Sequence, residues 1–217
     1  MGRMNLYGMM EEIQVFLTNN LTDPRSRAST ATYSGTATAS QTVITISVAG
    51  INAITSVTIA GALKTFGTDY TVAYGAASCV ITMTSAMSVG NSISIPYKYG
   101  TKWIYPDWAK ESLSQASYPR VSLLWGNIIT TPSGLGAAGN FNDIIISITV
   151  FSESVKETMQ IADEIRDDIA GNKKGFYNFA FIDLAGVGPI LTAPERKGEI
   201  TYCALTFRIP LKYETNS

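Results

Sequence analysis

The chain has 217 residues, with 16 Lys and Arg against 17 Asp and Glu, two cysteines and no histidine. A net charge of −1 leaves no basic excess to neutralise nucleic-acid phosphates or an anionic membrane surface. The lack of histidine excludes Ser-His-Asp and Cys-His nucleophiles and every histidine-containing metal site. We therefore expect no enzyme, no cofactor and no metal. The longest apolar run, residues 144–151, is far below the roughly 20 residues that span a bilayer, so we expect no membrane partner.

Charged side chains are distributed very unevenly along the chain. Residues 28–100 contain only three of them, Lys64, Asp69 and Lys98. This stretch is rich in Thr, Ser, Ala, Val and Ile, in alternating patterns that favour strands. We therefore predict two domains: residues 1–27 together with 101–217 form a discontinuous α+β domain, and residues 28–100 form an all-β sandwich inserted into one of its loops.

The N-terminal segment has apolar residues at helical spacing, which predicts an amphipathic helix from Leu6 to Asn20. Its apolar face contains Leu6, Met9, Met10, Ile13, Phe16 and Leu17. Glu11 and Glu12 lie opposite this face, and we interpret them as part of a solvated surface.

Within the low-charge stretch, alternating segments bounded by glycines predict five short strands. These are residues 42–48, 55–59, 70–74, 79–84 and 92–99. Two packed sheets would cover their apolar faces. The lead at residues 28–40 is almost entirely Thr, Ala and Ser, and it is either a linker or an edge strand.

After this stretch, two strands are predicted at residues 118–125 and 143–151, joined by a Gly-rich loop. Two further strands are predicted at residues 176–184 and 200–213, separated by a turn-rich segment. A second helix lies between the two pairs. The discontinuous domain is thus predicted to have the order helix, strand, strand, helix, strand, strand.

The second helix begins where Ser154 and Glu157 have capping-box spacing, and it ends at Gly171. Its predicted core face contains Val155, Met159, Ala162 and Ile165 or Ile169. Its outer face is charged and includes the pair Asp163 and Asp167, which we interpret as solvated surface and not as acid and base catalysts.

One segment matches a nucleotide-binding pattern literally. Gly134, Gly136 and Gly139 form G-x-G-x-x-G, which in dinucleotide sites precedes the helix that holds the pyrophosphate. Here a strand follows, so no helix terminus is available to hold a phosphate. We interpret the segment as a hairpin loop.

The cysteines fall in different predicted domains, Cys79 in the insert and Cys203 outside it, and we expect two reduced, packed thiols.

The discontinuous domain resembles the tail terminator, or tail completion, proteins of long-tailed bacterial and archaeal viruses. The likeness lies in the N-terminal helix, in the strand beginning at residues 118–123, in the strand 144–151 that runs directly into the second helix, and in the closing strand 199–213. The insert is similar to the small immunoglobulin-like modules of viral structural proteins, most clearly over residues 67–72.

The resemblance implies a non-enzymatic virion protein in the tail or neck, assembled in the host cytoplasm. It would form a ring, usually of six copies, that caps the tail tube and joins it to neck and head completion proteins, and possibly to the sheath. DNA would only pass through the lumen, and the insert would point outward. Candidate contacts between subunits come from the two long loops and the charged helix face: Gly134, Gly136, Gly139, Asp163, Asp167, Glu195, Arg196 and Lys197.

Other functions are compatible with the same residues. Another neck or connector subunit would have similar features, and a surface module that binds glycan through the insert is a second alternative. An enzyme using carboxylates and the Gly-rich loop is a third.

Overall fold

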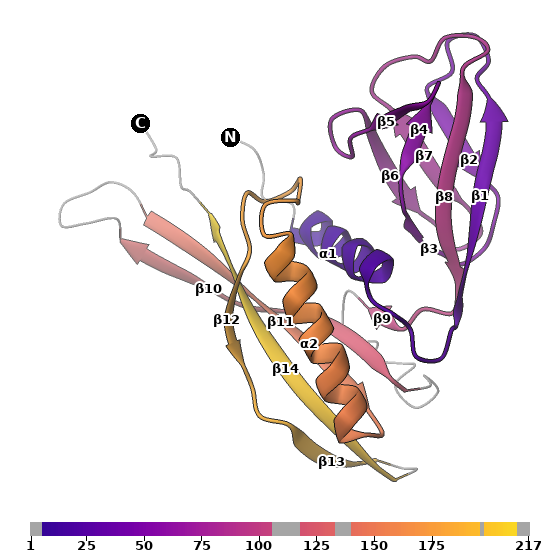
Figure 1. The fold of residues 1–217 in the computed structure, drawn as a ribbon. Helices are drawn as coiled ribbons and strands as arrows, with labels where there is room; N and C mark the ends of the chain where they lie inside the picture. Colours follow the sequence, from indigo (N-terminus) through magenta and orange to yellow (C-terminus); the bar gives the residue numbers. More distant parts are fainter. Residues whose placement is uncertain (1–5, 106–117, 133–139, 196–197, 212–217) are drawn as a thin grey trace. The chain divides into compact units, whose positions relative to one another are not determined.

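A computed structural model describes residues 6–105, 118–132, 140–195 and 198–211 (Figure 1). The chain divides into two compact units, residues 1–17 with 103–217 (unit 1) and residues 18–102 (unit 2). Composition had placed these divisions at 27/28 and 100/101. The first division instead falls within helix α1 (Leu6–Asn20). Two hydrogen bonds explain this boundary. Lys98 Nζ donates to the carbonyl oxygens of Thr18 and Asn19, at 2.8 and 3.1 Å, and so attaches the last turn of α1 to unit 2.

The structure is mostly β, with 49% of residues in strands and 18% in helices, so the α+β fold class and the helix–strand order expected for a tail terminator are wrong. The strands are longer and more numerous than predicted. Two strands of unit 1 extend over 13 residues each, and one over 14. Short strands also form in segments that were predicted to be turns.

Unit 2 consists of two sheets that share one apolar core. The larger sheet has the order β1-β8-β4-β5, with β3 also paired to β8, and the smaller has the order β2-β7-β6. The strands are β1 (Ala28–Thr36), β2 (Val43–Ile46), β3 (Ile51–Ile54), β4 (Val57–Ile59), β5 (Ala62–Lys64), β6 (Tyr70–Tyr74), β7 (Cys79–Met83) and β8 (Ser92–Gly100).

The core of unit 2 follows from alternation along its strands, because successive side chains of a strand point to opposite faces. Ile44 and Ile46 of β2 meet Ile81 of β7 and Ile95 of β8, and each is at most 2% exposed. The Thr- and Ser-rich lead is the edge strand β1, which pairs with β8 along its whole length. Thr, Ser and Ala therefore occupy a sheet edge, where little burial is required.

Two connections of unit 2 have well-defined local conformations, one a two-residue turn and the other a hydrogen-bonded loop. Strands β4 and β5 are joined by Ala60 and Gly61, whose φ angles of 52° and 79° match the two-residue turns that suit the twist of a hairpin. Before β1, the Asp23 carboxylate accepts hydrogen bonds from the Arg25 and Arg27 backbones and from the Arg27 side chain. Burial alone would raise the pKa of Asp23, but these hydrogen bonds and the Arg27 charge lower it below its usual value.

Unit 1 is built on one sheet with the order β12-β14-β11-β10-β9, and β13 also pairs with β14. Its strands are β9 (Ile104–Tyr105), β10 (Arg120–Pro132), β11 (Asn140–Ser152), β12 (Asp183–Val187), β13 (Leu191–Glu195) and β14 (Gly198–Leu211). All pairs are antiparallel except β9 with β10. Residues 176–184 were predicted to be a strand. Most of this segment is instead a loop that buries Phe176, Phe179 and Ile182 at a spacing of three.

Helix α2 (Val155–Gly171) lies across the face of the sheet, over β14 and β11 (Figure 1). Its buried residues are Thr158, Ile161, Ala162, Ile165 and Ile169. Val155 and Met159, which were predicted to be in the core, are each 50% exposed. The predicted face of this helix was therefore wrong by part of a turn.

The reason for this error is Thr158, a polar residue that is fully buried. Its hydroxyl donates to the Ser154 carbonyl oxygen at 3.0 Å and lies 2.8 Å from the Thr201 hydroxyl of β14. Thr201 in turn donates to the Ser152 carbonyl oxygen at 3.1 Å. The predicted capping box is also absent, because the Ser154 side chain makes no cap. Glu157 instead accepts a hydrogen bond from the Ser152 hydroxyl.

Helix α1 buries Met9, Met10, Ile13 and Leu17, each at most 2% exposed, as its spacing predicted. Glu12, interpreted from the sequence as solvated, is half-buried. Its carboxylate accepts hydrogen bonds from the Tyr177 and Asn178 backbones and from the Asn178 side chain. Glu12 thus holds the loop after α2 against α1.

Candidate functional site

The outer edge of β10 is covered by another strand over only a small part of its length. Strand β9 pairs with β10 only at Val121 and Ser122. From Leu123 to Pro132, in the part of the chain that the structure describes, no strand covers this side of β10. The open segment is about 30 Å long at roughly 3.3 Å per residue. Its backbone donors and acceptors are available to another strand.

The open edge lacks one common protection against strand pairing, a charged side chain. Residues 121–142 contain no charged side chain, whereas natural edge strands commonly have Lys or another charge that discourages association. Two large apolar side chains are exposed there, Ile128 at 51% and Ile129 at 49%. Ile144, the partner of Ile128 on β11, and Ile209, the partner of Ile144 on β14, are fully buried.

A bulge shapes the open edge. The register between β10 and β11 shifts between Trp125 and Ile128, so Gly126 and Asn127 stand opposite the single residue Ile145. A Cβ on Gly126 would lie 3.1 Å from both the Ile145 side chain and its carbonyl oxygen. Glycine therefore permits the close approach of the two strands at the bulge. Bulges increase local twist and re-aim the strand that follows, here the segment with Ile128 and Ile129.

The opposite edge of the same sheet is also uncovered by any strand within the described ranges. It is formed by β12 and β13, which pair with β14 on their inner sides. Val187 on β12 is 54% exposed and Leu191 on β13 is 45% exposed. One sheet thus has two open edges, each with exposed aliphatic side chains.

The charged face of α2 is partly neutralised by ion pairs within the helix. Arg166 contacts Asp163 and Asp167 at 2.8 and 2.9 Å, and all three side chains are well exposed. These contacts raise the pKa of Arg166, chiefly through its hydrogen bond with Asp167. Exposed pairs of this kind contribute little to stability. The same outer surface contains the exposed apolar pair Val155 and Met159.

The sequence-predicted contact residues do not gather in one place. Asp163 and Asp167 lie on α2, and Glu195 is the last residue of β13. Gly134, Gly136, Gly139, Arg196 and Lys197 lie outside the described residues. The two long loops named above as sources of contacts, which the sequence placed at residues 130–142 and 184–197, are partly strand, because β10, β11, β12 and β13 extend into them. The open edge itself was missed, although the long uncharged run at residues 121–142 was visible in the sequence.

No protein-family model, curated protein or solved structure matches this chain significantly.

Among the described residues, no three His, Cys, Asp or Glu side chains are grouped where they could hold a metal ion. Within the same ranges, neither helix is long and apolar enough to cross a membrane. Cys79 and Cys203 are both buried, lie in different units and form no disulfide.

Proposed function

We propose that this chain is a structural protein that assembles into a ring, and that the ring is the tail terminator of a long-tailed virus. The observation that carries the assembly is the uncharged open edge of β10 on a sheet whose other edge, β12 and β13, is also open. Joining unlike edges is a heterologous contact, and such contacts form a closed ring when the rotation between copies closes.

The viral role rests on the sequence resemblance described above. The segments that carry it are α1, the start of β10, β11 followed directly by α2, and β14. All of them belong to unit 1, apart from the last turn of α1. Six copies are what the resemblance implies. The partners would then be the tail tube protein on one side and a neck or head completion protein on the other. Glu195, the last residue of β13, would contribute a contact at the second edge.

The test is the oligomeric state of the purified full chain, measured by native mass spectrometry and by electron microscopy of stained particles. We expect closed rings of one size, and we expect them to bind one end of isolated tail tubes. Rings that bind portal or capsid vertices and ignore tube ends would favour another neck or connector subunit. A chain that stays monomeric at high concentration, alone and with tube ends, would contradict the proposal.

A further inference from the structure

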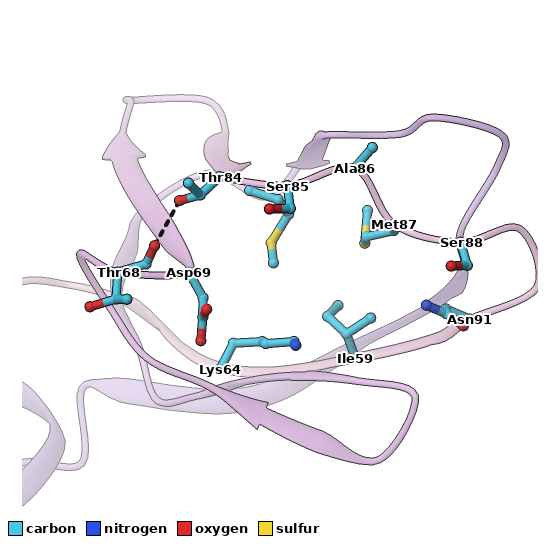
Figure 2. A pocket seen from close by; sticks show the side chains of 11 residues that line it. Ile59, Lys64, Thr68, Asp69, Thr84, Ser85, Ala86, Met87, Ser88 and Asn91 are labelled. Atoms are coloured by element: carbon cyan, nitrogen blue, oxygen red, sulfur yellow. Dashed lines mark hydrogen bonds between the residues drawn. The ribbon is translucent and has the colours of Figure 1, made fainter.

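Unit 2 contains a pocket of about 190 Å³ between the β6–β7 end of one sheet and the β4–β5 hairpin of the other (Figure 2). Its floor is apolar and its rim is polar. Lys64 and Asp69 both line it, and they are two of only three charged residues between positions 28 and 100. The third, Lys98, donates to the end of α1. A module that is otherwise uncharged thus places its two remaining charges in one pocket.

The wall that contains Asp69 is fixed by hydrogen bonds. The Thr65 N–H donates to Asp69 Oδ2 at 2.8 Å, and the Asp69 N–H donates to the Thr65 carbonyl oxygen at 2.8 Å. Thr84 closes the same wall, because its N–H donates to the Asp69 carbonyl oxygen at 2.8 Å and its hydroxyl donates to the Thr68 carbonyl oxygen at 2.9 Å. The second hydrogen bond is drawn in Figure 2.

The facing wall, residues 85–91, is fastened in the same way. The Met87 N–H donates to the Gln41 carbonyl oxygen at 2.9 Å, and the Gly90 N–H donates to the Ala37 carbonyl oxygen at 3.0 Å. The Asn91 N–H donates to the Ser88 carbonyl oxygen at 3.2 Å. The pocket is therefore preformed, and a ligand would bind without the cost of ordering its walls.

The two charges occupy different parts of the pocket. Figure 2 shows the Lys64 ammonium directed away from the Asp69 carboxylate and toward Ile59. No ion pair joins Lys64 to an acidic group within the described residues. The ammonium of Lys64, a half-buried residue, can therefore donate to a ligand at one end, while the carboxylate can accept from a ligand at the other. Met83, Met87 and Ile59 provide an apolar surface between them.

We propose that this pocket binds one acidic sugar residue, with its carboxylate at Lys64 and its hydroxyls donating to Asp69. Charge-assisted hydrogen bonds of these two kinds are strong and directional. The surrounding hydroxyl and amide side chains suit a ligand with many hydroxyl groups, and the apolar floor suits the C–H face of a sugar ring. The volume is below the roughly 300–1,000 Å³ of drug-sized sites, which fits one ring. This inference does not depend on ring assembly.

The test is a titration of the full chain with glucuronate and, separately, with glucose, followed by NMR chemical shifts of unit 2. We expect millimolar binding of glucuronate, with shifts centred on residues 64–69 and 84–91, and weaker binding of glucose. Lys64→Met should weaken glucuronate binding by about tenfold or more, because a charged hydrogen bond is lost. Lys64→Arg should retain most of it.

Lys174→Met is the matched control, since it removes the same charge from an exposed lysine of unit 1 and should change nothing. Each of three results would overturn the inference. These are no binding of either sugar, equal binding of glucuronate by wild type and Lys64→Met, and stronger binding of free alanine than of glucuronate. The last result would assign the two charges to an amino acid. An unchanged thermal midpoint for each variant would show that lost binding is not lost folding.

Discussion

Replacing Ile165 with Asp should unfold unit 1, so that the variant is insoluble or has lost its near-ultraviolet circular dichroism. Ile165 is fully buried on the face of α2 that covers the sheet. The substitution creates a cavity and places a carboxylate at a position that is 0% exposed. Together these effects cost about 5 kcal/mol, which is comparable to the whole stability of many domains.

The matched control is Met159→Asp on the same helix. Met159 is 50% exposed, so the same new charge stays hydrated, and the variant should remain folded with a change of about 1 kcal/mol or less. Thermal unfolding of the two variants under the same conditions makes the comparison. Equal losses of stability, or a greater loss for Met159→Asp, would mean that the helix face is assigned incorrectly.

This pair of residues also shows where sequence reasoning failed. The existence of α2 and its end at Gly171 were predicted from periodicity and the terminal glycine. Its face was wrong because the predicted core did not include Thr158, which is fully buried. Threonine can be buried when its hydroxyl has partners, and Thr158 finds them in Ser154 and Thr201. The Thr201 partner is 43 residues away and could not be identified from the sequence.

Changing both Ile128 and Ile129 to Lys should abolish assembly and leave the subunit folded. Both side chains are already about half-exposed, so the fold loses little. The new charges place on β10 the feature that natural edge strands use to prevent pairing. We expect the dissociation constant between copies to rise by about 100-fold or more, which corresponds to roughly 2.7 kcal/mol. Native mass spectrometry would then show monomers at concentrations where wild type forms rings.

The control for this variant is Val155→Lys with Met159→Lys. It adds the same two charges at side chains of nearly the same exposure, on the outer face of α2. This control should still assemble. Rings formed by the Ile128→Lys/Ile129→Lys variant would contradict an interface at the strand edge. Rings lost only in the α2 control would place the interface on the helix.

The local sequence pattern predicted strands correctly where buried and exposed residues alternate regularly. It failed where contacts with a distant segment determine the structure. Alternation located all of β2, β4, β6 and β7 and all but the last residue of β8 in unit 2. By contrast, the aromatic run at residues 176–184 has strand propensity, but its buried residues recur every third position, and Glu12 anchors it through bonds spanning 165 and 166 residues. No local signal shows that pairing.

The features relevant to function could be predicted only in part from the sequence. The scarcity of charge in residues 28–100 was evident, but only the fold brings Lys64 and Asp69 into one pocket. Likewise, the uncharged run at residues 121–142 was present in the sequence, but whether it formed a central or an edge strand depended on β9 pairing with just two residues of β10.

The most direct measurement of the central idea is cross-linking between the two sheet edges of different copies. Ile129→Cys would be placed on one batch of the full chain and Val187→Cys on another, because these exposed side chains mark opposite edges. A short bis-maleimide would be added to each batch and to their mixture. We predict covalent dimers in the mixture and not in either batch alone, and covalent ladders ending at the ring size in the double-cysteine chain. Dimers formed by the Ile129→Cys batch alone, with no ladder from the double variant, would indicate a two-fold contact between like edges and contradict the ring.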